Sequence, residues 1–225
     1  MKFTTPYTPP TLTVDAVLFQ MNNNSLDVLL IRRSAAPFKG AWALPGGYNA
    51  AGQTTQQALG EVLKRKTGTI LDKDVTHLEQ LYTFDTIARD PRGHAVSVVY
   101  TGCGRDITHG GGSEVSAFYP VDDLPELAYD HKDIITYARE RLATKLANTN
   151  VAYSLLPPKF TLSHLQTVYE AALGKELDKR NFRKKFLSLD LIRETNETWR
   201  EGAHRPAKLY EFKSQSLETL QRSFE

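Results

Sequence analysis

The chain has 225 residues, of which 40% are hydrophobic and 24% are charged, so it can bury a packed core as one large or two smaller domains, which argues against disorder. The net charge of +2 does not by itself indicate a nucleic-acid partner, but residues 151–225 hold 13 Lys and Arg against 10 Asp and Glu, which places the excess of base in the C-terminal third. The sequence has no apolar stretch of about 20 residues and no leader in residues 1–10, and its single Cys103 excludes an internal disulfide, so we expect a cytoplasmic protein without a membrane partner.

Short strands predominate in the first part of the chain. Runs rich in Val, Leu and Ile predict strands at residues 12–19, 26–31, 78–84, 95–101 and 115–121, the first two joined as a hairpin. A helix is expected from about Thr54 to Thr67, after a Pro-Gly-Gly turn and before Gly68. A second helix, from His131 to Leu146, repeats its apolar residues at helical spacing and closes this part of the chain.

The last third has a different pattern. Residues 148–158, which carry Pro157-Pro158, are predicted as a linker. Thr161 or Ser163 can cap the helix that follows, and Asp178 can cap a second helix with a buried Phe stripe and a basic outer face. Two strands, 191–194 and 208–212, come next, joined by a basic loop. Helix, turn, basic helix and hairpin in this order are typical of a winged helix-turn-helix.

The segment from Gly46 to Thr69 resembles the Nudix box, whose helical carboxylates bind magnesium. When Gly47 and Gly68 are aligned with the two glycines of the box, the three helical carboxylate positions fall on Val62, Arg65 and Lys66. Two cations in place of carboxylates repel a hard divalent cation instead of compensating its dehydration. We therefore predict no metal site and no hydrolysis of diphosphates, and we regard the remaining Glu61 as a surface residue.

The sequence around this box is similar to one subfamily, the Nudix-related transcriptional regulators of the NrtR type. The matching segments are Ile31-Arg32-Arg33-Ser34, Pro37-Phe38-Lys39-Gly40, Trp42-Ala43-Leu44-Pro45-Gly46-Gly47, Asp90-Pro91-Arg92-Gly93, Tyr129-Asp130-His131, Phe160-Thr161-Leu162, Arg180-Asn181-Phe182-Arg183-Lys184-Lys185 and Arg205-Pro206-Ala207. The resemblance implies an α/β protein: a Nudix α/β/α sandwich with a mixed sheet in residues 1–148, a linker in 149–159 and a winged helix-turn-helix in 160–225. It also implies that the first domain senses ADP-ribose, with no cofactor, and that the second represses genes of NAD metabolism.

A cleft that keeps the Nudix shape without metal can hold a diphosphate if cationic side chains and backbone amides replace the ion. The expected phosphate contacts are Arg33, Lys39, Arg89 and Arg92. Gly46 and Gly47 would allow close approach of the backbone, and Asp90 or His131 would bind ribose hydroxyls.

The second helix of the last third is expected to read a double-stranded DNA operator. Lys179, Arg180, Asn181, Arg183 and Lys184 belong to this recognition helix, where Arg can read guanine and Asn adenine in a major groove. Lys185 would contact phosphate, and the wing would contribute Trp199, Arg200, His204 and Arg205. A single winged helix makes few base contacts, so we expect a homodimer on a palindromic operator.

Two alternatives remain at this point. The chain could be an active Nudix hydrolase of ADP-ribose-like diphosphates that uses Glu61 and carboxylates elsewhere, or a regulator of the same architecture that responds to a sugar. The effector, the target genes and the sign of regulation are not encoded in any pattern we can identify.

Overall fold

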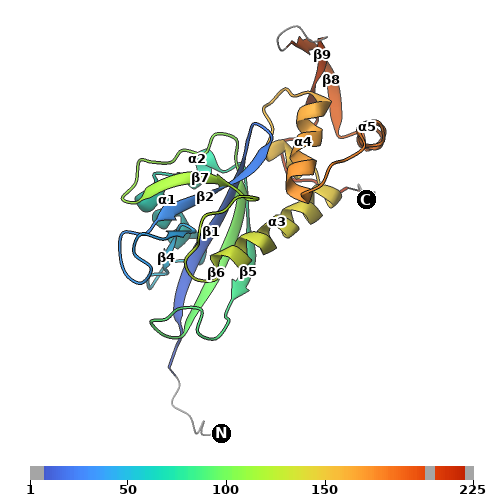
Figure 1. The fold of residues 1–225 in the computed structure, drawn as a ribbon. Coiled ribbons are helices and arrows are strands. Elements are labelled where there is room, and N and C mark those ends of the chain that lie inside the picture. Colours follow the sequence, from blue (N-terminus) through green and yellow to red (C-terminus); the bar gives the residue numbers. More distant parts are fainter. Residues whose placement is uncertain (1–7, 201–205, 221–225) are drawn as a thin grey trace, which may run out of the picture.

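The structure is a computed structural model that describes residues 8–200 and 206–220. A mixed seven-stranded sheet with helices on both faces makes up the first part, and a helical unit with a β-hairpin makes up the last (Figure 1). Its elements in chain order are β1 (Thr11–Asn22), β2 (Ser25–Arg32), β3 (Trp42–Ala43), β4 (Gly46–Tyr48), α1 (Thr55–Thr67), α2 (Leu71–Asp74), β5 (His77–Phe84), β6 (Ala95–Cys103), β7 (Val115–Pro120), α3 (His131–Asn148), a 3₁₀ turn η1 (Val151–Ser154), α4 (Leu162–Leu173), α5 (Lys179–Ser188), β8 (Ile192–Trp199) and β9 (Ala207–Phe212). No helix in the described part of the chain is long and apolar enough to cross a membrane.

Strand β1 organises the sheet. It runs parallel to β6 over its whole first part, while β4 pairs with its beginning and β2 with its end, both antiparallel. The predicted hairpin is confirmed: Asn22 pairs with Ser25, and Asn23 takes the left-handed conformation in the turn between them. β7 pairs with β2, and β5 forms one edge beyond β6.

The side chains of β1 alternate between two apolar layers. Val14, Ala16 and Leu18 pack against α1, and Val17 and Phe19 pack on the opposite face against α3. A strand that is covered on both faces reads as a continuous apolar run, as β1 does. The α/β/α sandwich expected from the sequence is confirmed. The alternation also places Asp15 on the α3 face, at the end of the sheet where α3 begins.

The predicted helix after the glycine turn is confirmed, with local reasons for both of its ends. Thr54 caps α1 by accepting from the backbone N–H of Gln57, and the Gln57 side chain accepts from Thr54 in return. Gly68 ends the helix in the left-handed conformation, with a φ of 83°. This geometry fixes the last turn of α1 and so the positions of Arg65 and Lys66.

The segment between the two parts is largely buried. Residues 149–159, predicted as a linker, contain η1, and Val151, Leu155 and Leu156 belong to the same apolar cluster as α3 and α4. Asn150 also exchanges hydrogen bonds with Ser216 and Glu218, which ties the C-terminal segment to the end of α3. The connection is therefore a packed joint, with only Pro157-Pro158 and Lys159 exposed.

The last third has the predicted order of elements. α4 begins at a capping box formed by Thr161 and His164 and ends at Gly174 in the left-handed conformation. Phe182 and Phe186 of α5 pack against Tyr169 of α4, and β8 and β9 form the hairpin that follows. The two strands are longer than predicted. In Figure 1 this unit lies at the far end of α3, with the hairpin pointing away from the sheet.

Candidate functional site: a basic cleft and a basic helix

An open cleft of about 290 Å³ lies at the end of the sheet where α3 begins. Its walls come from β1, the loop after β2, strand β4 with Gly46 and Gly47, the last turn of α1, the loop before β6 and the start of α3. The lining residues are Thr13, Asp15, Arg33, Ala35, Ala36, Leu44, Gly46, Gly47, Tyr48, Arg65, Lys66, Arg89, Asp90, Arg92, Tyr129 and His131.

The fold brings most of the expected ligand-binding residues together here. Arg33, Gly46, Gly47, Arg89, Asp90, Arg92 and His131 all line the cleft. Lys39 does not line it, because it lies in the exposed loop between β2 and β3. Several of these side chains already have hydrogen-bond partners within the protein, and these partners limit what each side chain can contribute to ligand binding.

Arg89 is held against the start of α3. Its side chain is only 5% exposed, and its Nε and Nη2 donate to the two carboxylate oxygens of Asp130 at 2.9 and 2.8 Å. A two-point pair of this kind fixes the direction of the guanidinium. Arg89 therefore attaches its loop to α3 and adds positive charge to the cleft wall, at 4.0 Å from Asp15.

Arg92 and Asp90 form a second pair on the rim. Arg92 donates to Asp90 through Nε at 3.0 Å and through Nη2 at 2.6 Å, and its Nη1 donates to the hydroxyl of Tyr48 at 2.7 Å. The hydrogen bonds from Arg92 lower the pKa of Asp90 below its usual range. A ribose hydroxyl would have to share or displace this pair in order to reach Asp90.

His131 is hydrogen-bonded to the segment that precedes strand β4. The backbone N–H of Leu44 donates to its Nδ1 at 2.8 Å, and its Nε2 lies 3.9 Å from Asp15. Burial lowers the pKa of His131, although Asp15 and Asp130 act in the opposite direction. The imidazole is therefore a neutral acceptor that positions Leu44 and, through it, Gly46 and Gly47.

Two cations of α1 complete the cleft, and the sequence pointed to them only as lost metal ligands. Arg65 and Lys66 line the wall next to Gly47, and neither has a carboxylate within 4 Å among residues 8–200 and 206–220. Burial lowers the pKa of Lys66, partly offset by Glu114. Arg33, which also lines the cleft, has its guanidinium carbon 5.0 Å from the ring centre of Tyr129. In total, five cations and two carboxylates line the cleft, which suits a ligand with two negative charges.

A Nudix fold implies magnesium, and the residues present do not fit that ion. In the described part of the chain, no three His, Cys, Asp or Glu side chains are grouped to hold a metal. The position next to Gly47 is filled by Val62, whose Cγ2 would lie 2.9 Å from a Cβ added at that glycine. An apolar contact and two cations thus occupy the space that a carboxylate cluster would need.

The expected DNA-reading residues lie on α5 and the hairpin. Lys179, Arg180, Asn181 and Lys184 are exposed, and Asp178 caps the helix by accepting from the backbone N–H of Asn181 at 2.8 Å. Arg183 is half-buried and donates to Ser163 at 3.3 Å, so it is turned toward α4; Lys185 is also half-buried. Trp199 and Arg200 are exposed at the end of β8, whereas His204 and Arg205 lie outside the described residues.

Comparison with known proteins assigns a family to each part. A model described as the NUDIX domain matches residues 9–138, and one described as the NrtR DNA-binding winged helix domain matches residues 152–212. A curated protein of Acinetobacter baylyi, the ADPR responsive transcriptional repressor NtrR, is 36% identical over 220 residues, 94% of this chain and 86% of that protein. The chain belongs to the NrtR family.

Solved structures agree with membership of the NrtR family. Shewanella oneidensis NrtR complexed with a 27mer DNA has a TM-score of 0.79 and 34% identity, covering 95% of this chain and 99% of that one. The NUDIX domain of the same protein complexed with ADP ribose has a TM-score of 0.54 and 36% identity, covering 60% of this chain and 90% of that one. The resemblance inferred from the sequence and the expected two-part fold are both confirmed.

One further relative of this NrtR family member is an enzyme. An ADP-ribose pyrophosphatase of Methanocaldococcus jannaschii is 36% identical over 131 residues, 57% of this chain and 73% of that protein. Family membership therefore identifies the Nudix part, and whether this particular cleft hydrolyses a diphosphate depends on its own residues.

Proposed function

We propose that this chain is a transcriptional repressor whose Nudix domain binds ADP-ribose without metal and whose winged helix binds operator DNA. One observation carries the proposal: the cleft is rich in cations where metal-binding carboxylates would stand. Helix α3 runs from that cleft to the winged helix and connects the two parts. The relatives support it, because one is named for its response to ADPR and another was crystallised with DNA.

The cleft offers complementary groups for each part of ADP-ribose. Its diphosphate would lie among the cleft cations Arg33, Arg65 and Lys66, near the backbone of Gly46 and Gly47. Arg89 and Arg92, which are already paired, would act mainly through their charge. The phenol ring of Tyr48, 59% exposed at the rim, offers a flat apolar surface for a base or a sugar.

We further propose that the cleft senses its ligand and does not hydrolyse it. The family's chemistry needs a divalent ion to activate water and neutralise the diphosphate, and the residues here do not fit one. Fixed cations can stabilise the bound diphosphate, but they supply no activated water. The hydrolase alternative would need carboxylates from another part of the chain.

Regulation would follow from two arrangements of the winged helices in a homodimer, because a ligand shifts an equilibrium only by its different affinity for the two states. ADP-ribose would favour the arrangement that does not match the half-sites of a palindromic operator, and DNA would be released. The resemblance noted above suggests genes of NAD metabolism as targets, and a repressor of such genes works in the cytoplasm.

A gel-shift titration tests the proposal. The DNA is the region upstream of the protein's own gene neighbourhood, titrated with and without ADP-ribose, in magnesium and in a chelator. We expect specific binding that ADP-ribose relieves under both conditions. Absence of specific binding, with ADP-ribose consumed only when magnesium is present, would instead establish an enzyme.

The sugar-responsive alternative is separated by a thermal-shift comparison of ADP-ribose with free pentoses. A ligand that binds only the native state stabilises it by mass action, so the melting temperature rises with the ligand concentration relative to its dissociation constant. We expect a shift with ADP-ribose alone.

A further inference from the structure

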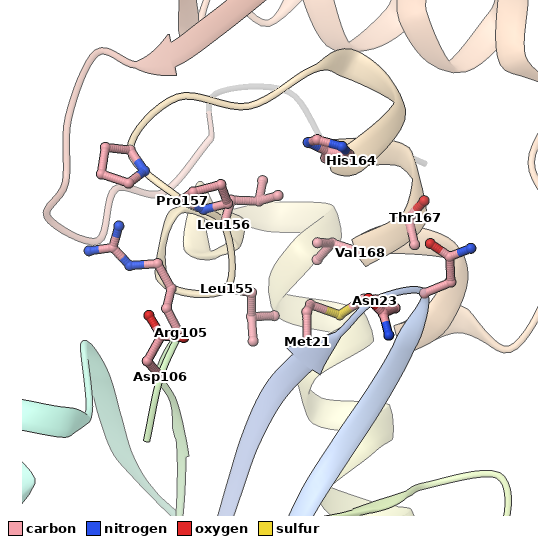
Figure 2. A pocket seen from close by; sticks show the side chains of 12 residues that line it. Met21, Asn23, Arg105, Asp106, Leu155, Leu156, Pro157, His164, Thr167 and Val168 are labelled. Carbon is pink, nitrogen blue, oxygen red and sulfur yellow. The ribbon is translucent and has the colours of Figure 1, made fainter. Parts of the chain in front are cut away.

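A second cavity, of about 370 Å³, lies between the two parts of the molecule and far along the sheet from the basic cleft. The turn of the β1–β2 hairpin and the loop after β6 form its walls on the Nudix side, and α4 forms the wall on the winged-helix side (Figure 2). Residues 155–158 of the joint close it. Its lining consists of Met21, Asn23, Asn24, Arg105, Asp106, Leu155, Leu156, Pro157, Pro158, His164, Thr167 and Val168.

The middle of this cavity is apolar. Leu155, Leu156 and Val168 are at most 3% exposed and belong to the main core, and Met21 packs against the same cluster. Figure 2 shows Leu155, Leu156 and Met21 between the loop that carries Arg105 and Asp106 and Val168 of α4. Because Leu155, Leu156 and Val168 are already covered, the apolar surface left for a ligand comes from the half-buried Met21 and the exposed Pro157 and Pro158.

The wall after β6 carries two opposite charges that are not used within the protein. Arg105 and Asp106 are neighbours in the chain, and neither has a hydrogen bond from its side chain or an ion pair within 4 Å to any residue of 8–200 or 206–220. Arg105 is half-buried. The lining has no other formally charged group, so its net charge is zero, whereas the basic cleft has an excess of three positive charges. This difference disfavours a second diphosphate here.

We propose that this cavity is a binding site for a small zwitterion with an aliphatic body, of the type of an apolar amino acid. Arg105 would hold the carboxylate and Asp106 the ammonium group, each in a charge-assisted hydrogen bond. The aliphatic side chain would pack against Met21 and Pro157. Thr167 and the exposed Asn23 lie on the opposite side of the cavity and limit the length of the ligand.

Binding at this site would change the affinity for operator DNA, an effect that rests on the proposed function. The ligand would contact both parts of the chain at once, so it would favour the relative arrangement in which the cavity has this width. Its effect on operator affinity and the effect of DNA on its own affinity must be equal by linkage. The site thus supplies a second input to DNA binding, separate from the basic cleft.

The test is isothermal titration of the full chain with L-leucine. We expect saturable binding, and binding about tenfold weaker or more for 4-methylpentanoate, which lacks the ammonium group, and for 3-methylbutylamine, which lacks the carboxylate. L-serine, which keeps the zwitterion without the aliphatic body, should also bind weakly.

Two variants and two matched controls locate the site. Arg105→Gln and Asp106→Asn should each weaken L-leucine by about tenfold or more. Asp72→Asn and Lys73→Gln remove a neighbouring pair of opposite charges that is exposed on α2 and outside the cavity, and they should leave the affinity unchanged. Melting temperatures of all four show whether a loss of binding is a loss of folding.

No binding of L-leucine by the folded wild type would overturn the inference, as would equal affinity for L-leucine and 4-methylpentanoate or undiminished binding by Arg105→Gln. ADP-ribose titrated into the same samples separates this inference from the proposed function. If ADP-ribose binds and L-leucine does not, only the second site is wrong; if L-leucine binds and ADP-ribose does not, only the proposed function is wrong.

Discussion

Arg139, midway along α3, donates a hydrogen bond of 3.1 Å from its Nε to the carbonyl oxygen of Ala172 in the last turn of α4. Its Nη2 also donates to the carbonyl oxygen of Ala171 at 2.7 Å, and its Nη1 lies 2.6 Å from a carboxylate oxygen of Asp122. A cation at the carbonyl end of a helix is stabilised by the helix dipole. Because α3 begins at the basic cleft with His131, one helix contacts both this cleft and the winged helix.

Arg139→Ala should reduce the effect of ADP-ribose on DNA binding. The change removes charge-assisted hydrogen bonds to α4, so we expect a loss of about 2 kcal/mol in the free energy of unfolding. The affinity for ADP-ribose should stay the same, while the ratio of operator affinities without and with ADP-ribose falls several-fold. Fluorescence anisotropy of labelled operator measures this ratio. Arg141→Ala, exposed on the same helix, is the control; if it lowers the ratio as much, Arg139 has no special part in coupling.

Charge reversal on α1 should abolish sensing and leave DNA binding intact. Arg65→Glu and Lys66→Glu place a carboxylate beside the expected diphosphate, so each should lower the affinity for ADP-ribose by at least about tenfold. Operator affinity without effector should remain as in the wild type. Lys64→Glu changes the same charge on an exposed position of α1 that does not line the cleft. An equal loss with this control would mean that only overall charge matters.

His131 makes the protein less stable in mild acid. Its pKa in the folded state is lowered by burial from an ordinary value near 6.5, so below that pH the unfolded chain binds a proton that the folded chain does not. The stability contributed by the neutral imidazole is complete above pH 6.5 and is lost as the pH falls toward the folded pKa. We expect the melting temperature to drop between about pH 7 and about pH 5.

The variant His131→Asn keeps an acceptor for Leu44 but does not titrate, so its melting temperature should depend less on pH. His77 also has a pKa lowered mainly by burial, so the variant His77→Asn measures its separate contribution to the pH dependence of the melting temperature. An unchanged pH dependence in His131→Asn would assign the whole effect to other groups.

Two exposed residues of α5 should differ in what they contribute to DNA binding. Lys184→Ala should weaken binding to all sequences similarly and lower the slope of affinity against salt by about one, as expected for a phosphate contact. Asn181→Ala should cost about 1–3 kcal/mol on the operator only, as expected for a base contact. Gel-shift titrations at several salt concentrations, with operator and scrambled DNA, measure both. If Asn181→Ala weakens operator and scrambled DNA equally, Asn181 contacts no base.

Local signals in the sequence were enough for most of the elements. The capping residues Thr161 and Asp178 and the stop signal Gly68 act within one helical turn, so they can be read without knowing the fold. The period of the apolar residues located helix α3 and the buried face of α5 for the same reason. The short β3, β4 and α2 were missed because each spans four residues or fewer and depends on its neighbours for its hydrogen bonds.

The partners of charged side chains were decided by the tertiary structure alone. The sequence supplied Arg89, Arg92 and His131 as ligand candidates, but only the fold brings Arg89 to Asp130, 41 positions away, and His131 to Leu44, 87 positions away. Long-range pairing depends on how the sheet and α3 pack, and no local pattern records it. The buried joint at residues 149–159 is a second example. Its proline pair predicts a linker, whereas in the fold its apolar residues belong to the core cluster that includes α3 and α4.

The sequence by itself determined that Val62, Arg65 and Lys66 stand at the three helical positions where the Nudix box has carboxylates. Only the tertiary structure decided that the same two cations line one cleft with Arg33, that α3 connects this cleft to α4, and that Arg105 and Asp106 line a cavity between the two parts. The charge and functional group of a side chain follow from the residue type alone. A binding site also requires the right distances between residues far apart in the chain, and the packing of the core sets those distances.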